Sequence, residues 1–225
     1  MLQVRNLTKQ YGDRGILNLS FKADSGSVLA VVGPNGAGKT TLFRCLAGLQ
    51  SCDSGECMLD EEMLNRVPRN DIGFLPENPY LPPDFTPYQT ALYYLQMRKS
   101  RFTDAMLRQA FQQLGAWDYR NIKNSQLSQG MLKKASAVLA FIEEPRLLIL
   151  DEPTNGLDTH SVILFKEQVQ KAKSAGAIVL ISSHILDFVG HIADDILFLH
   201  YDFSKRMQVS ENAMLEEEYK RLFHT

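Results

Sequence analysis

The eight residues from Gly33 to Thr40, Gly-Pro-Asn-Gly-Ala-Gly-Lys-Thr, restrict the fold of this chain more than any other stretch. They follow the apolar run 28–32, Val-Leu-Ala-Val-Val, and lead into the segment 41–46. Their spacing, Gly, four residues and Gly-Lys-Thr, is the pattern of a phosphate-binding loop. Glycines allow main-chain N–H groups to surround an anion, and the positive end of a following helix points at the same place. The pattern therefore predicts a buried strand, a nucleotide-binding loop and a helix in succession.

This loop assigns roles to individual residues. Lys39 is expected to bridge the outer phosphates of a nucleotide, and the Thr40 hydroxyl to coordinate Mg²⁺. The alternative is a glycine-rich turn that contains a lysine by chance, but the strand before it and the helix after it favour nucleotide binding. The predicted nucleotide-binding residues of this stretch are Gly33, Pro34, Asn35, Gly36, Ala37, Gly38, Lys39, Thr40 and Thr41.

Length and charge limit the remaining possibilities. The 225 residues suffice for one large α/β domain, with or without a smaller attached part, and not for two nucleotide-binding domains. The formal net charge of −2 provides no basic surface, so we expect no nucleic-acid partner. The N-terminus lacks a signal-peptide pattern, and no apolar run approaches the ~20 residues that span a bilayer. We therefore expect a cytoplasmic protein, for which any role at the membrane comes through a partner.

Apolar strands alternate with helices along most of the chain, which predicts an α/β fold with a mostly parallel sheet. Two segments with alternating apolar residues precede the phosphate-binding loop and predict an N-terminal antiparallel β part. The expected strands are 2–11, 16–23, 28–32, 56–59 (a short edge strand), 70–75, 146–150, 177–182 and 195–200. One helix is expected directly after the phosphate-binding loop, and two more are expected at 159–174 and at 185–193. A terminal segment, 211–225, is interpreted as a solvated helix, with docking onto another subunit as the alternative.

A change of composition at Pro76 predicts an insertion in this fold. Prolines crowd the stretch 76–87, which excludes a regular helix there and indicates an extended loop. Three segments with helical periodicity follow, from 86 or 87 to 99, at 103–114 and at 128–142. We therefore expect a single domain made of a catalytic core, 1–76 and 144–225, and a helical subdomain with its linking loop, 77–143.

Two acidic residues, Asp151 and Glu152, follow the apolar strand 146–150. Open α/β sheets bind their ligands at the carboxyl ends of the strands, so this position suits a catalytic pair. Asp151 is expected to hold Mg²⁺ through water, and Glu152 to polarise the water that attacks a γ-phosphate. The alternative is a strand that turns acidic where it reaches the surface.

Taken together, these motifs resemble the ATP-binding cassette family, the nucleotide-binding subunits of ABC transporters. Residues 127–131, Leu-Ser-Gln-Gly-Met, stand where the family has its signature, just before a helix and upstream of Asp151. The resemblance implies a phosphate-binding-loop NTPase core that hydrolyses ATP with Mg²⁺ and dimerises head to tail. It also implies that Ser128, Gln129 and Gly130 contact the ATP bound by the other subunit.

Further family elements occur in the same order. Tyr11 resembles the aromatic residue that stacks on adenine, although a lone tyrosine at a strand end more often serves packing. Residues 155–158, Asn-Gly-Leu-Asp, resemble a loop in which Asp158 touches the partner cassette. His184 resembles the switch histidine that contacts the γ-phosphate, which makes Glu152, His184 and Lys39 the expected catalytic residues.

The chain departs from the family pattern at two places. Glu77 stands where the family usually has a glutamine that contacts Mg²⁺ and links to the membrane subunit. A carboxylate can still bind Mg²⁺, so the expected metal ligands are Thr40, Asp151 and Glu77. The second departure, Gln129 and Met131 in the signature, keeps the serine and the glycine. Both features resemble the exporter ATPases for drugs and antibiotics.

The resemblance implies an ATP-hydrolysing subunit that drives a separate transmembrane permease, in the direction of export. The dimer is either a homodimer or a heterodimer with a related cassette, and the sequence does not identify the transported substrate. The alternative function is a soluble ABC ATPase in DNA repair or translation. Such relatives usually carry a long coiled-coil insertion or two tandem cassettes, and this chain has neither.

Overall fold

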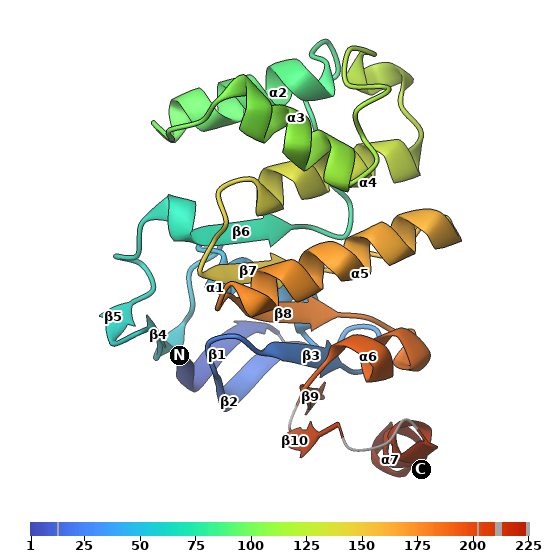
Figure 1. Ribbon diagram of the computed structural model, residues 1–225. Helices are drawn as coiled ribbons and strands as arrows, with labels where there is room; N and C mark the ends of the chain where they lie inside the picture. Colours follow the sequence, from blue (N-terminus) through green and yellow to red (C-terminus); the bar gives the residue numbers. More distant parts are fainter. Residues whose placement is uncertain (13, 202, 210–212, 224–225) are drawn as a thin grey trace.

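The computed structural model describes residues 1–12, 14–201, 203–209 and 213–223 (Figure 1). Two sheets organise it. The first is antiparallel, with strand order β2-β1-β4-β5. The second has the order β10-β9-β3-β8-β7-β6 and is parallel except for the pairing of β10 with β9. The predicted fold class, a mostly parallel α/β core with an antiparallel β part and helices, is confirmed.

The antiparallel sheet contains β1 (Leu2–Tyr11), β2 (Arg14–Ala23), β4 (Ser54–Leu59) and β5 (Glu62–Met63). The parallel sheet contains β3 (Val28–Val32), β6 (Ile72–Leu75), β7 (Leu147–Leu150), β8 (Ile178–Ser182), β9 (Asp195–Leu199) and β10 (Ser204–Gln208). The helices are α1 (Lys39–Leu46), α2 (Pro87–Met97), α3 (Asp104–Gln113), α4 (Gln129–Phe141), α5 (Thr159–Ser174), α6 (Leu186–Ile192) and α7 (Ala213–Phe223). Short 3₁₀ turns occupy Arg69–Asp71 and Asn124–Gln126.

The parallel sheet lies between two hydrophobic clusters, because alternate residues of its strands point to opposite faces. In β3, for example, Ala30 belongs to one cluster and Val31 to the other. The first cluster packs the sheet against α2 to α6. The second contains α1 and both long strands of the antiparallel sheet, so α1 is enclosed between the two sheets. Continuous burial on both faces explains why β3, β7 and β8 are uninterrupted apolar runs.

The predicted helices of the insertion form, and hydroxyl caps set where they start. Thr86 caps α2 in a reciprocal arrangement with Gln89, and Thr103 accepts a hydrogen bond from the Met106 N–H at the start of α3. In Figure 1, α2 and α3 lie at one end of the molecule and α4 lies between them and β6. Residues of α4 belong to the same hydrophobic cluster as the parallel sheet. The division between a catalytic core and a helical subdomain, at residues 77 and 143, stays a prediction.

The sequence expectations need correction at four strands. β4 begins at Ser54 and pairs with β1 and with β5, so it is not the edge strand; β5 was not expected. The segment before Ile72 forms a 3₁₀ turn instead of extending β6 to residue 70. β10 was also missed, because its sequence, Ser-Lys-Arg-Met-Gln, is mostly polar, although Lys205 and Met207 are half-buried.

The terminal helix forms but is not simply solvated. Leu215 is 1% exposed and belongs to the cluster that contains β9, and Tyr219, Leu222 and Phe223 pack against that cluster. The opposite face carries exposed residues such as Glu217. Residues 211, 212, 224 and 225 of the predicted helix lie outside the described residues.

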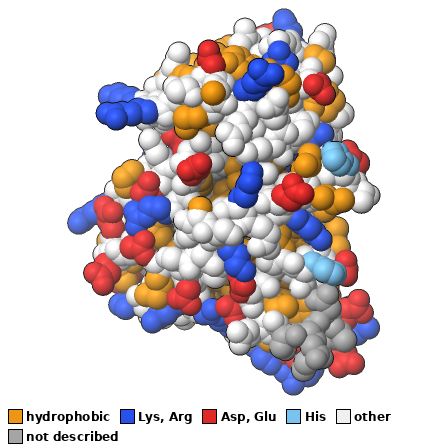
Figure 2. Space-filling view, viewed as in Figure 1, with side chains coloured by type: hydrophobic (Ala, Val, Ile, Leu, Met, Phe, Trp, Pro, Cys, Tyr) orange, Lys and Arg blue, Asp and Glu red, His pale blue; other side chains and the backbone are white. Residues whose placement is uncertain are grey.

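No helix in the described part of the chain combines the length and the apolar character that crossing a membrane requires. On the face drawn in Figure 2, lysine and arginine side chains are interspersed with aspartate and glutamate.

The packing of α7 generates a stability prediction. Leu215→Ala removes a buried side chain and leaves a cavity, so we expect the free energy of unfolding to fall by about 2–5 kcal/mol. Urea unfolding followed by circular dichroism measures this loss. Glu217→Ala on the exposed face is the control, and equal stability of the two variants would show that α7 does not contribute to the core.

Candidate active site

The loop between β3 and α1 is shaped by close main-chain approaches. A Cβ atom at Gly33 would lie 2.1 Å from the carbonyl oxygen of Leu199 on β9. Gly38 has a φ of 99°, in the left-handed region, and a Cβ there would lie 2.6 Å from the carbonyl oxygen of Gly15. A larger residue fits at neither position without a shift of the backbone. These glycines therefore hold the loop tightly between β9 and the β1–β2 hairpin.

Lys39 begins α1 and bends back over the loop. Its ammonium group donates hydrogen bonds to the carbonyl oxygens of Gly33, at 2.7 Å, and Pro34, at 3.1 Å. Burial lowers the pKa of Lys39, an effect that Glu152, Asp151 and, less strongly, Glu77 oppose through their charges. The loop thus holds its cation in a defined position.

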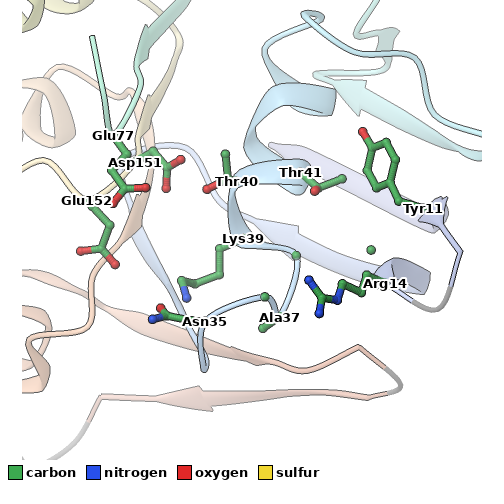
Figure 3. A pocket seen from close by; sticks show the side chains of 13 residues that line it. Tyr11, Arg14, Asn35, Ala37, Lys39, Thr40, Thr41, Glu77, Asp151 and Glu152 are labelled. Atoms are coloured by element: carbon green, nitrogen blue, oxygen red, sulfur yellow. The ribbon is translucent and has the colours of Figure 1, made fainter.

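A cavity of about 360 Å³ opens beside this loop (Figure 3). In Figure 3, Thr40 at the start of α1 faces the side on which Asp151 and Glu152 lie, and Tyr11 stands at the opposite end. The residues around the cavity come from the β1–β2 hairpin, the phosphate-binding loop and the ends of β6 and β7. They are Tyr11, Arg14, Gly15, Asn35, Gly36, Ala37, Gly38, Lys39, Thr40, Thr41, Glu77, Asp151 and Glu152.

The cavity brings together most of the sequence-predicted site residues. Gly33 and Pro34 do not line it; they contribute the carbonyl oxygens that hold Lys39. Arg14 and Gly15 line it and were missed by the sequence analysis. Arg14 could have been found from the β1–β2 hairpin, because the register of the two strands places Arg14 directly opposite Tyr11.

Asp151 is 1% exposed at the end of β7 and has one satisfied and one free carboxylate oxygen. Its Oδ1 accepts a hydrogen bond from the Ser182 hydroxyl at 2.7 Å. Its Oδ2 is buried and has no hydrogen-bond partner among the described residues. A buried carboxylate oxygen without a partner is costly unless a cation or water binds it. With the Thr40 hydroxyl and Glu77 on the same cavity, this oxygen fits a hard cation such as Mg²⁺.

Glu152 is held through its main chain and its side chain. Its N–H donates to the Ser182 hydroxyl at 2.9 Å, and its Oε2 lies 2.9 Å from Nδ1 of His184. Its φ of 45° is left-handed, a conformation that a residue with a side chain adopts only when its surroundings enforce it. His184 does not line the cavity, and it is connected to the cavity through Glu152.

Ser128, Gln129 and Gly130 do not line the cavity. They form the start of α4, where the Ser128 hydroxyl accepts a hydrogen bond from the Met131 N–H. A Cβ at Gly130 would lie 2.7 Å from the Gly156 carbonyl oxygen, so this segment packs against the loop 155–158. Asp158 ends that loop by capping α5 through the Ser161 N–H. The structure therefore places the signature residues away from the phosphate-binding loop of the same chain.

Comparison with known proteins decides the family. The model of the ABC transporter family matches residues 16–155, which is more than half of the chain. The chain belongs to the ABC transporter family. The cassette is accordingly an ATP hydrolase, and the resemblance identified from the motifs is confirmed.

Several relatives cover nearly the whole cassette. The lantibiotic transport ATP-binding protein SrtF of Streptococcus pyogenes is 35% identical, with 98% of this chain and 100% of the relative aligned. The SkfA peptide export ATP-binding protein SkfE of Bacillus subtilis is 31% identical over 88% of this chain and 85% of the relative. A solved structure of an ATP-binding subunit of an ABC transporter superposes with a TM-score of 0.84 at 25% identity, covering 99% of this chain and 93% of that one.

Sequence reasoning missed two residues that support the acidic pair. Ser182 bridges Asp151 and Glu152 from the neighbouring strand β8, and the buried Lys133 contacts Glu152 from α4. Neither belongs to a motif that the sequence analysis recognised. The signal for Ser182 was its position as the polar last residue of an apolar strand.

Ser182 supplies a prediction that requires no ligand. Ser182→Ala leaves Asp151 Oδ1 and the Glu152 N–H without their partner, so we expect the free energy of unfolding to fall by about 1–3 kcal/mol. Urea unfolding of the apo protein measures the change. The control is Ser174→Ala at the exposed end of α5. A Ser182→Ala protein as stable as this control would contradict the proposed bridging role.

Proposed function

We propose that this cassette is the ATP-hydrolysing subunit of an exporter and that it works as a head-to-tail dimer on a separate transmembrane permease. The observation that carries the proposal is the single cavity in which the phosphate-binding loop faces Asp151 and Glu152. The two relatives described above are a transport and an export ATP-binding protein, which supports export. These relatives give no support to a role in DNA repair or translation.

Nucleotide binding uses the two ends of the cavity. Tyr11 is 52% exposed at one end, where its ring stacks on adenine; Lys9 Nζ lies 5.6 Å from the centroid of that ring. The N–H groups of the loop and the N-terminus of α1 bind the phosphates at the other end. Lys39 exchanges its hydrogen bonds with the loop carbonyls for bonds to the outer phosphates. The Lys39 ammonium then stabilises the negative charge that develops on the phosphates during hydrolysis.

Thr40, Asp151 and Glu77 are the residues that would hold Mg²⁺. The ion, when bound, neutralises charge on the β- and γ-phosphates. Thr40 offers a neutral oxygen from α1, and Asp151 offers its unpaired Oδ2 from the end of β7. Glu77 lines the same cavity and contributes a further carboxylate.

Hydrolysis depends on the direction of the Glu152 carboxylate. Glu152 accepts a hydrogen bond from a water molecule and takes its proton as the water oxygen bonds to the γ-phosphorus. The bond from that phosphorus to the bridging oxygen breaks, and ADP and phosphate leave. His184 Nδ1 lies 2.9 Å from Oε2 of the same carboxylate, so His184 orients Glu152.

A second cassette completes the site. Ser128 and Gly130 lie at the start of α4, where N–H groups are available to bind an anion, and they are absent from the cavity of their own chain. A two-fold arrangement brings them onto the phosphates bound by the partner. ATP then lies between the two subunits, and its binding favours the closed dimer that acts on the permease.

The role of Glu152 is tested by Glu152→Gln, which preserves shape and removes the proton acceptor. We expect kcat for ATP hydrolysis to fall by about 100-fold or more, with the Kd for ATP within about threefold of the parent. Phosphate release measures turnover, and fluorescence titration with a labelled ATP measures affinity. By contrast, Lys39→Ala removes the cation that contacts the phosphates, so we expect it to weaken ATP binding in the same titration. Glu167→Gln on the exposed face of α5 is the matched control, and hydrolysis at the parent rate by Glu152→Gln would refute the mechanism.

The shared site is tested in the Glu152→Gln background, in which ATP is retained. With Mg²⁺ and ATP we expect a dimer in sedimentation velocity, and Ser128→Arg should abolish it because the arginine side chain blocks the phosphate contact. Ser125→Arg, three residues away on an exposed site, is the control. An unchanged dimer in Ser128→Arg would contradict the head-to-tail arrangement.

A further inference from the structure

Lys133 is a buried lysine that the proposed mechanism does not use. It lies early in α4, the helix that begins at the signature, and is 4% exposed. Lysine is almost never buried without a partner. The partner here is a main-chain atom, because the Lys133 ammonium donates a hydrogen bond to the Glu152 carbonyl oxygen at 2.8 Å. The contact links the start of α4 to the end of β7.

This hydrogen bond acts on a residue whose backbone is unusual. With φ at 45°, Glu152 is in the left-handed region, which is unfavourable for a residue with a side chain. The two peptide groups that flank Glu152 are both held. Ser182 binds the Glu152 N–H, and the Glu152 carbonyl oxygen accepts hydrogen bonds from Lys133 and, at 3.3 Å, from the Asn155 N–H. A hydrogen bond from a charged donor is stronger than one between neutral groups. Lys133 therefore supplies the shorter, charged one of the two hydrogen bonds that hold this carbonyl oxygen.

Charge gives Lys133 a second effect on the same site. Burial lowers the pKa of Lys133, and the carboxylates of Glu77, Glu152 and Asp151 oppose this shift. All three carboxylates line the cavity, where negative charge disfavours a triphosphate. The Lys133 ammonium, bound to the Glu152 carbonyl oxygen, offsets part of that negative charge.

We propose that Lys133 is a positioning residue for hydrolysis, which holds the Glu152 main chain in the conformation that directs its carboxylate into the cavity. The inference rests on the proposed catalytic role of Glu152. Lys133 also ties this conformation to α4, whose N-terminus carries Ser128 and Gly130. The helix that would contact the ATP of the partner is therefore the helix that holds the Glu152 of its own chain.

The test compares Lys133→Met, which keeps side-chain length but removes the donor and the charge, with Lys133→Arg, which keeps both. Steady-state and single-turnover hydrolysis of ATP with Mg²⁺ give kcat and KM, and titration with a fluorescent ATP analogue gives affinity. For Lys133→Met we expect kcat to fall by about tenfold or more while KM and affinity stay within about twofold. Lys133→Arg should recover a measurable part of kcat. Lys166→Met on α5 is the control for loss of a half-buried lysine and should retain parental turnover.

The outcomes separate this inference from the proposed function. Parental kcat in Lys133→Met overturns the inference and leaves the role of Glu152 intact. Equal loss of turnover and nucleotide affinity, with a lower melting temperature and no rescue by Lys133→Arg, indicates a merely structural role and also overturns it. A parent protein whose turnover does not exceed that of Glu152→Gln contradicts the proposed function itself.

Discussion

The register of the parallel strands is the constraint on which the site depends. Leu75, Leu150 and Ile181 are register partners across β6, β7 and β8, and Val31 on β3 pairs with Ser182. The carboxyl ends of these strands are therefore aligned along one edge, where open α/β sheets bind their ligands. The phosphate-binding loop leaves β3 at this edge, and the acidic pair leaves β7 there. A shift of one residue in any of these pairings would move a catalytic group and would also reverse the faces of that strand.

Carboxylates and buried cations meet at this edge of the sheet. Three carboxylates, Glu77, Asp151 and Glu152, meet two partly or fully buried cations, Lys39 and Lys133. Each cation donates to main-chain carbonyl oxygens, with no direct ion pair to these carboxylates in the described part of the chain. Asp151 Oδ2 thus remains available for a ligand.

The parts of the site that could be predicted from the sequence are those encoded by contiguous residues. Gly33 to Thr40 and Asp151-Glu152 carry their spacing and their flanking apolar runs with them, so both the elements and the chemistry follow from local pattern. Arg14, Lys133 and Ser182 could not be predicted in the same way, because each acquires its role from a contact made across the fold. The burial of α7 could have been predicted, since Leu215, Tyr219 and Leu222 recur at helical spacing and form an apolar stripe among the charged residues. The charged sequence of that helix obscured its apolar stripe.

The enclosure of α1 between two sheets has a consequence for how the protein opens. Phe43 on α1, Leu7 and Ile16 on the antiparallel sheet, and Val31 on β3 share one hydrophobic cluster. Detaching the antiparallel sheet would expose α1 to water and release the loop that precedes it. We therefore expect β1 and α1 to open together, with their amide hydrogens exchanging through one shared opening. The phosphate-binding loop is in this sense held by the packing of two whole sheets on α1, with β7, β8 and β9 contributing to the same cluster.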